Sequence, residues 1–287
     1  AEFIEYDYSN RMISGNTRED GSKCGFGGCY YNRPSDRSDD FNEISARFGV
    51  STTFEELNYF AQISLGFRPP QINEAYRLQK KQNVTDLDSE TLTMIEIGSR
   101  FDRDTVNGSV SFYKSKKKNS IFRDAENFIV DNGKTDHEGI ELSLNWLISS
   151  NNTVSSNITY GDHRYDFETD TSMREKIRIG NKIDTSPKLM ANLIWDLNLR
   201  NDSSISFEIE HMSSYYTDAA NLHEYDGHTL YHARYNKNLS TSLKGFVRVD
   251  NIFDKAYAER ADFNAFGGDR YFPGLPREFY VGIEYTF

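Results

Sequence analysis

Long hydrophobic runs are missing from this sequence of 287 residues. No run approaches the roughly 20 apolar residues of a membrane-spanning helix. Positive charge is also scarce, because 33 lysines and arginines face 44 aspartates and glutamates and leave a net charge of −11. A nucleic-acid partner would require a basic surface for its phosphates, so this charge balance argues against one.

Motifs for catalysis and for metal binding are missing too. The sequence has no nucleophile elbow, no HExxH pair and no phosphate-cradling glycine loop. His228 and His232 are four positions apart, which on a strand is about 13 Å and too far to share one ion. The acidic run at 86–90 has the carboxylate spacing of a calcium loop without its glycine, which favours a solvated acidic loop. We therefore expect no enzyme, no cofactor and no metal site.

Alternation of apolar and polar residues is what the sequence does contain. In its last stretch the odd positions from Phe279 to Phe287 are all apolar or aromatic, whereas Glu284 and Thr286 stand at even positions. A period of two puts the two sets on opposite faces of a sheet. The same pattern predicts twelve strands, at residues 1–9, 42–54, 58–68, 91–102, 105–117, 134–148, 153–168, 187–200, 203–217, 227–238, 241–253 and 277–287.

The connections between these stretches are by turns very short and long. The long ones, at 10–41, 69–90, 118–133, 169–186, 218–226 and 254–276, carry the usual turn formers Gly, Pro, Asn and Asp. Short periplasmic turns and long outer loops are typical of an outer-membrane β-barrel, and an aromatic content of 14% suits its two aromatic girdles. A soluble sandwich or propeller also has alternating apolar and polar residues, but its connections need not alternate between short and long. We predict an all-β, transmembrane antiparallel β-barrel with both chain ends at the periplasmic rim.

Three segments resemble one family of such barrels. Residues 66–79 (GFRPPQINEAYRLQ), 248–263 (RVDNIFDKAYAERADF) and 270–287 (RYFPGLPREFYVGIEYTF) look like the C-terminal part of TonB-dependent outer-membrane receptors. The resemblance implies a 22-stranded barrel around an N-terminal plug, with about 12 strands present here. Residues 1–287 would then be the C-terminal portion of the barrel domain, without the plug.

The same resemblance implies a function. Such a receptor resides in the bacterial outer membrane and imports a scarce nutrient, most commonly an iron–siderophore complex, using energy from TonB. Its partners would be outer-membrane lipid and lipopolysaccharide, its own plug, the TonB complex and a small-molecule or chelate ligand. An alternative from another class is a self-contained 12-stranded barrel that acts as a passive pore or a structural adhesin.

The only two cysteines lie close together in the first long connection. Cys24 and Cys29 stand in CGFGGC, and a glycine-rich loop of this kind can close into a small disulfide in an oxidising compartment. Half of a metal site is the competing interpretation, but two thiols without further ligands are too few for structural zinc. We predict a disulfide.

Aromatic residues and arginines gather in the first and last long connections. Together they suit flat, anionic or catecholate ligands through stacking and charge-assisted hydrogen bonds. Simple packing of the loops over the barrel mouth is the alternative. The candidate ligand-binding residues are Tyr30, Tyr31, Arg33, Arg37, Tyr257, Arg260, Phe263, Arg270 and Tyr271.

Charged residues within the predicted strands indicate which face of the sheet contacts water. A charged side chain facing lipid at mid-membrane costs about 2–4 kcal/mol, so these residues should line the lumen. They are Arg47, Arg68, Glu96, Arg100, Glu141, Glu208, Glu210, Arg248 and Glu284. Lys114, Lys116 and Lys118 instead continue the lipid-facing parity, and either meet lipopolysaccharide phosphates or form a solvated strand end.

Overall fold

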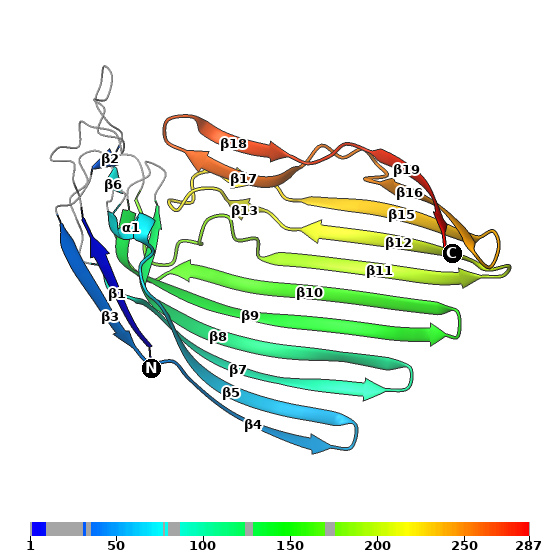
Figure 1. The fold of residues 1–287 in the computed structure, drawn as a ribbon, viewed down its shortest axis with the longest axis horizontal. Coiled ribbons are helices and arrows are strands. Elements are labelled where there is room, and N and C mark those ends of the chain that lie inside the picture. The colour runs from blue at the N-terminus through cyan, green and yellow to red at the C-terminus, as the bar shows by residue number, and fades with distance from the viewer. Residues whose placement is uncertain are drawn as a thin grey trace.

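The structure, a computed structural model, describes residues 2–9, 31–32, 36–76, 78–79, 87–123, 129–169 and 176–286. Most of these residues belong to one large, curved antiparallel sheet (Figure 1). Its eleven strands, from one edge to the other, are β19 (Glu278–Tyr285), β16 (Leu243–Asp250), β15 (His228–Asn238), β12 (Ser203–Met212), β11 (Leu189–Leu199), β10 (Asn152–Tyr165), β9 (Ile129–Ser149), β8 (Val106–Arg123), β7 (Glu90–Arg103), β5 (Leu57–Arg68) and β4 (Ala46–Phe54).

The remaining elements are short or form separate pairs. Four two-stranded sheets accompany the large one: β1 (Glu2–Tyr8) with β3 (Arg37–Glu43), β2 (Tyr31–Asn32) with β6 (Leu78–Gln79), β13 (Tyr215–Tyr216) with β14 (Glu224–Tyr225), and β17 (Ala258–Asn264) with β18 (Gly268–Pro273). One five-residue helix, α1 (Ile72–Tyr76), follows β5. In the described ranges, no helix is long and apolar enough to cross a membrane.

All twelve predicted stretches form strands, but they do not all join the large sheet. Eleven of the twelve predicted stretches pair in it, but the first one forms β1, which pairs with β3 alone. The predicted strand 42–54 is interrupted at residues 44–45, where β3 ends and β4 begins. Glu2 lies opposite Glu43 beside this break, so β1 does not start at the periplasmic rim as expected. Alternation predicts an extended segment but contains no information on which strand it pairs with.

Within the described residues the large sheet is open. β4 and β19 are its two edges and do not pair with each other. The predicted barrel wall is therefore confirmed as an antiparallel sheet, whereas closure within these strands is not seen. The described strands therefore do not form a closed 12-stranded barrel.

The two ends of the sheet differ, as Figure 1 shows. At the turn end, tight connections join β4 to β5, β7 to β8, β9 to β10, β11 to β12 and β15 to β16. In the turn between β11 and β12, Asn201 and Asp202 both have positive φ (63° and 55°), a conformation that Asn and Asp tolerate well. At the opposite end, the loop end, lie α1 and the small strand pairs. The predicted long connection at 118–133 is mostly strand, because β8 runs to Arg123 and β9 begins at Ile129.

The strand register divides the large sheet into an apolar face and a polar face. Leu142 lies directly opposite Val110 and Ile158, while its neighbour Glu141 lies opposite Ser111 and Thr159. On the edge strand β19, Phe279, Val281 and Ile283 are 69%, 79% and 71% exposed, and their partners on β16 are Val249, Val247 and Gly245. Such exposure of a continuous apolar face is expected where lipid rather than water covers it.

The apolar face is limited to a band. Near the turn end, Trp146 and Trp195 both lie opposite Val154, and Phe207 lies opposite Trp195. Near the loop end, Ile140 lies between Phe112 and Tyr160. One row farther, Glu138 lies between Lys114 and Asp162, so charged side chains replace apolar ones. Aromatic residues near both ends of an apolar band are typical of the two membrane interfaces, although on β11 Leu197 and Leu199 continue the apolar face past Trp195.

Candidate functional site

The polar face carries all nine charged residues predicted to line the lumen. Across neighbouring strands, the Arg47 guanidinium donates to Gln62 Oε1 at 2.8 Å, and Gln62 donates in turn to Glu96. Asn192 donates to Glu208 at 2.6 Å. Because β-strand side chains alternate strictly, this sidedness follows from the register and confirms the prediction.

The lysines on the apolar side of β8 lie beyond the apolar band. Lys114 Nζ is 3.0 Å from Glu138 and Lys116 Nζ is 3.2 Å from Asp136, so acidic side chains on β9 partly neutralise this strand end. These ion pairs are exposed and contribute little to stability. Contact of these lysines with lipopolysaccharide phosphates stays a prediction.

In the last long connection, two predicted ligand-binding arginines converge on one acid. Arg260 and Arg270 each lie 2.6 Å from a different oxygen of Asp262, whose side chain is only 8% exposed. Both arginines come from the β17–β18 hairpin, where Asp262 stands opposite Arg270. The acid fixes the position of the two guanidinium groups, whose outer edges remain half exposed. Asp262 therefore partly compensates the positive charge that these guanidinium groups present to a ligand.

The aromatic residues of this hairpin pack against the preceding loop. The Phe263 ring stacks on His223 with centroids 3.9 Å apart, and Asp269 lies 3.1 Å from His223 Nδ1. Tyr271 lies 6.3 Å from the Tyr225 ring and is 55% exposed. The structure thus uses Phe263 for packing between loops, while Tyr271 retains a free surface.

Tyr257 completes this set of predicted residues at the base of the hairpin. Its ring lies 4.7 Å from His228 and covers Gly274, whose position would place a Cβ 2.1 Å from that ring. Burial raises the pKa of the Tyr257 hydroxyl. The ring is therefore part of the packed base of the loops.

A partly buried carboxylic acid lies near this loop cluster. Asp184, between β10 and β11, accepts a hydrogen bond of 2.6 Å from the Tyr165 hydroxyl. Burial raises the pKa of Asp184, the Tyr165 hydrogen bond opposes the rise, and the nearby carboxylates Asp218 and Asp262 add to it. A proton is therefore held here more tightly than on an ordinary aspartate.

The first long connection is described only in part. Cys24, Cys29, Tyr30 and Arg33 lie outside the described residues, and only the backbone of Tyr31 is described, in β2. The disulfide and the ligand-binding roles of these residues stay predictions.

Arg37, the last candidate from this connection, is the first residue of β3. Its guanidinium Nε lies 2.8 Å from Asp39, which also accepts a hydrogen bond of 2.7 Å from the Tyr76 hydroxyl on α1. Burial and this hydrogen bond raise the pKa of Tyr76. Arg37 therefore stands at a position where an acid already compensates its charge.

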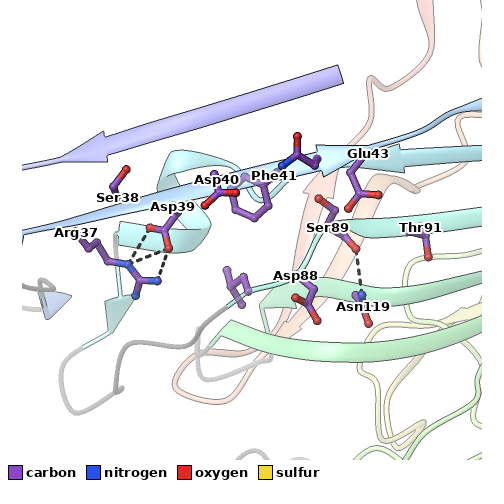
Figure 2. A pocket seen from close by; sticks show the side chains of 12 residues that line it. Arg37, Ser38, Asp39, Asp40, Phe41, Glu43, Asp88, Ser89, Thr91 and Asn119 are labelled. Carbon is purple, nitrogen blue, oxygen red and sulfur yellow. Dashed lines mark hydrogen bonds and ion pairs between the residues drawn. The ribbon is translucent and has the colours of Figure 1, made fainter. Parts of the chain in front are cut away.

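An acidic pocket of about 400 Å³ lies at the loop end between β3 and the start of β7. Figure 2 shows Asp39 and Asp40 on β3 across from Asp88 and Ser89, with α1 close to β3. Glu43 also lines the pocket, so four carboxylates face the single guanidinium of Arg37. This balance favours positively charged or hydrogen-bond-donating groups of a ligand over free anions.

One hydroxyl in the pocket lining has no described partner. The backbone oxygen of Ser89 accepts a hydrogen bond of 3.1 Å from Asn119, but Ser89 Oγ has no partner among the described residues, although Ser89 is only 3% exposed. The expectation of a solvated acidic loop at 86–90 was wrong for most of its described residues, because Leu87, Ser89 and Glu90 are buried and Glu90 already belongs to β7. Among the described residues, no group of three or more His, Cys, Asp or Glu side chains could hold a metal ion.

A buried ion cluster anchors the strand that follows this lining. Glu90, with a side chain 4% exposed, contacts Arg68 and Lys117 (2.8 Å) and accepts a hydrogen bond of 2.8 Å from the Ile121 N–H. Arg68 is also bound to Glu74 on α1 at 2.9 Å. The three-way contact fixes β5, β7, β8 and α1 to one another at the edge of the pocket. Residue alternation alone did not indicate this cluster.

An apolar face limited to a band, with aromatic residues near both ends and a polar face opposite, defines the wall of a membrane β-barrel. The family model for the TonB dependent receptor-like β-barrel matches residues 6–252. The chain belongs to this family. No match was found among the curated proteins.

Several solved structures share the fold. The ferric-catecholate import receptor Fiu of E. coli, in its closed form, has a TM-score of 0.74 and 18% identity, and the match covers 99% of this chain and 41% of that one. The siderophore receptor PiuA of Acinetobacter baumannii has a TM-score of 0.72 and 16% identity, covering 88% and 37%. For the ferric yersiniabactin uptake receptor FyuA of Yersinia pestis the values are 0.66 and 16%, covering 87% and 37%.

These identities are too low to carry a ligand from one protein to another, but the fold agrees. The chain spans about two fifths of the length of these receptors. The family model therefore establishes the family, and the solved structures establish the fold, but neither identifies the ligand.

Proposed function

We propose that this chain is the C-terminal portion of the barrel of a TonB-dependent receptor in the bacterial outer membrane, and that the receptor imports an iron–siderophore complex. The observation that carries the proposal is the sheet with one face suited to lipid and the other to water, in a chain that belongs to the receptor family. The related folds named above are those of receptors for siderophores or ferric chelates. An N-terminal plug and the TonB complex would be the partners of the whole protein.

The loop end is where we expect the ligand to bind, because recognition residues concentrate on loops that a rigid scaffold holds. Tyr271, Arg260 and Arg270 offer an aromatic ring and two positioned guanidinium groups there. The acidic pocket beside β3 offers the opposite charge. A chelate that presents both acidic and basic groups would engage both regions.

Uptake of radioactive iron tests the function. Cells in which the gene is the sole intact receptor gene should accumulate ⁵⁵Fe from siderophore complexes under iron limitation, and deletion of TonB should abolish the uptake. The double variant Asp40→Asn/Asp88→Asn should reduce uptake of the recognised complex, while Glu138→Gln, also at the loop end but outside the pocket, should leave it unchanged.

Two results would contradict the proposal. Uptake that persists without TonB would indicate a passive pore, and no accumulation from any siderophore complex would remove iron chelates as the cargo.

A further inference from the structure

A second cavity lies on the polar face, away from the acidic pocket. It measures about 340 Å³ and is lined by side chains from β7, β8, β9 and β10. Two histidines, two carboxylates, a thioether and a phenol are among its lining residues: His137, His163, Glu96, Glu141, Met94 and Tyr113. None of these groups had a predicted role in ligand binding.

Two glycines make room for the cavity. Gly139 and Gly161 lie directly opposite each other on β9 and β10. A Cβ at Gly161 would lie 2.5 Å from His163 Nε2, and a Cβ at Gly139 would lie 2.6 Å from the Tyr113 hydroxyl oxygen. Any larger residue would therefore displace the His163 ring or the Tyr113 ring. The site depends on this cross-strand glycine pair.

The two histidine rings meet at their Nδ1 atoms. His137 and His163 lie opposite each other in the β9–β10 register, and a hydrogen bond of 2.9 Å joins their Nδ1 atoms, so an ion shared by both rings would replace the hydrogen between them. Two nitrogens bound to one ion at about 2.0–2.1 Å and at a right angle lie about 2.9 Å apart. That is the cis edge of a square-planar or tetragonal site, the geometry of Cu(II) or Ni(II).

A hydrogen bond already orients one of the rings. Nε2 of His137 lies 2.8 Å from the hydroxyl oxygen of Thr135, a buried residue. When this nitrogen donates its proton to Thr135, Nδ1 of His137 keeps its lone pair and points at His163. Metal-binding histidines commonly have such a partner for the second ring nitrogen, because it fixes the tautomer and the ring orientation.

We propose that His137 and His163 form a two-nitrogen binding site for Cu(II) on the polar face of the sheet. Among divalent first-row metals Cu(II) binds nitrogen sites most tightly, and the two nearby carboxylates favour a cation. Because no third His, Cys, Asp or Glu in the described ranges completes a cluster, water or an incoming ligand supplies the other coordination positions. The site is formed by residues of β9 and β10 and does not depend on which ligand the receptor imports.

Copper titration of the intact protein, purified from outer membranes in detergent, tests the site. With Cu²⁺ alone as the probe, we expect one saturable site whose electron paramagnetic resonance spectrum is tetragonal and shows splitting from two imidazole nitrogens. His137→Ala and His163→Ala should each weaken binding at least tenfold, and Thr135→Val should weaken it about 10–100-fold through the loss of ring orientation.

His211→Ala is the matched control. His211 Nδ1 also contacts a threonine, Thr229, at 2.8 Å, but it lies on the apolar face and is not hydrogen-bonded to a second histidine in the described part of the chain. This variant should bind copper as the unaltered protein does. Copper binding that survives the double variant His137→Ala/His163→Ala would overturn the proposal. So would a spectrum of the unaltered protein without two-nitrogen splitting, a result that does not depend on whether any variant folds.

Discussion

Replacing Leu142 with arginine tests the claim that lipid covers the apolar face. Leu142 is four residues from Trp146, at one border of the apolar band, and four residues from Glu138, just past the other. At about 3.4 Å per residue, either border is about 14 Å away along the strand, farther than an arginine side chain extends. The new charge must therefore sit at mid-membrane.

The expected cost follows from this depth. A charged side chain on the lipid face of a barrel destabilises it by about 2–4 kcal/mol at the midplane. Since 1.4 kcal/mol corresponds to a factor of ten, the folding equilibrium constant should fall about 30-fold to 700-fold. Ser143→Arg is the matched control, because Ser143 is the next residue on β9 and lies on the polar face opposite Ser109 and Asn157. Its cost should be well below 1 kcal/mol.

Urea titration of the protein folded into phospholipid vesicles measures both variants. Both tryptophans of this sequence, Trp146 and Trp195, lie on the apolar face, so the emission of these residues reports contact with lipid. Equal destabilisation by Leu142→Arg and Ser143→Arg would refute the assignment of the two faces. So would emission that brominated lipid tails fail to quench.

Three further changes test single interactions by thermal unfolding. Glu90→Gln should cost about 1.5–3 kcal/mol, because it removes the buried negative charge that Arg68 and Lys117 contact, whereas Glu138→Gln in an exposed pair should cost under about 1 kcal/mol. Gly98→Ala should cost about 1–3 kcal/mol, since its Cβ would lie 2.6 Å from the Val110 carbonyl oxygen, while Gly66→Ala has open space and should cost less. The free energy of unfolding should fall as the pH rises, because the raised pKa of Asp184 means that the folded protein favours the protonated acid, and Asp184→Asn should remove this pH dependence. Equal costs within either pair, or a pH profile that Asp184→Asn leaves unchanged, would contradict the assigned interactions.

The pH dependence of the Glu90 cluster has the opposite sign. Burial acts to raise the pKa of Glu90, but hydrogen bonds from Arg68, the Ile121 N–H and Lys117 outweigh it and hold the pKa below the ordinary value. A lowered pKa contributes stability above the ordinary carboxyl range, and this stability is lost as the pH falls through that range. Measurements on the unaltered protein and on Glu90→Gln should diverge at neutral pH and converge in acid.

The two faces of β9 could be predicted from the sequence alone. The alternation of Glu141, Leu142 and Ser143 was enough to assign each side chain to its face, and the structure confirms that assignment. The same alternation missed the pocket beside β3, because the residues that line it come from segments about 45 positions apart. It also did not show that Asp262 compensates both Arg260 and Arg270.

The sequence by itself determined the strand rhythm, the two faces and the membership of a barrel family, because a period of two is a local property of the chain. Only the tertiary structure decided that β1 pairs with β3 outside the large sheet, and that the sheet stays open between β4 and β19. It alone placed His137 beside His163. Pairing between strands depends on register across long loops, and no local pattern specifies which side chains that register brings together.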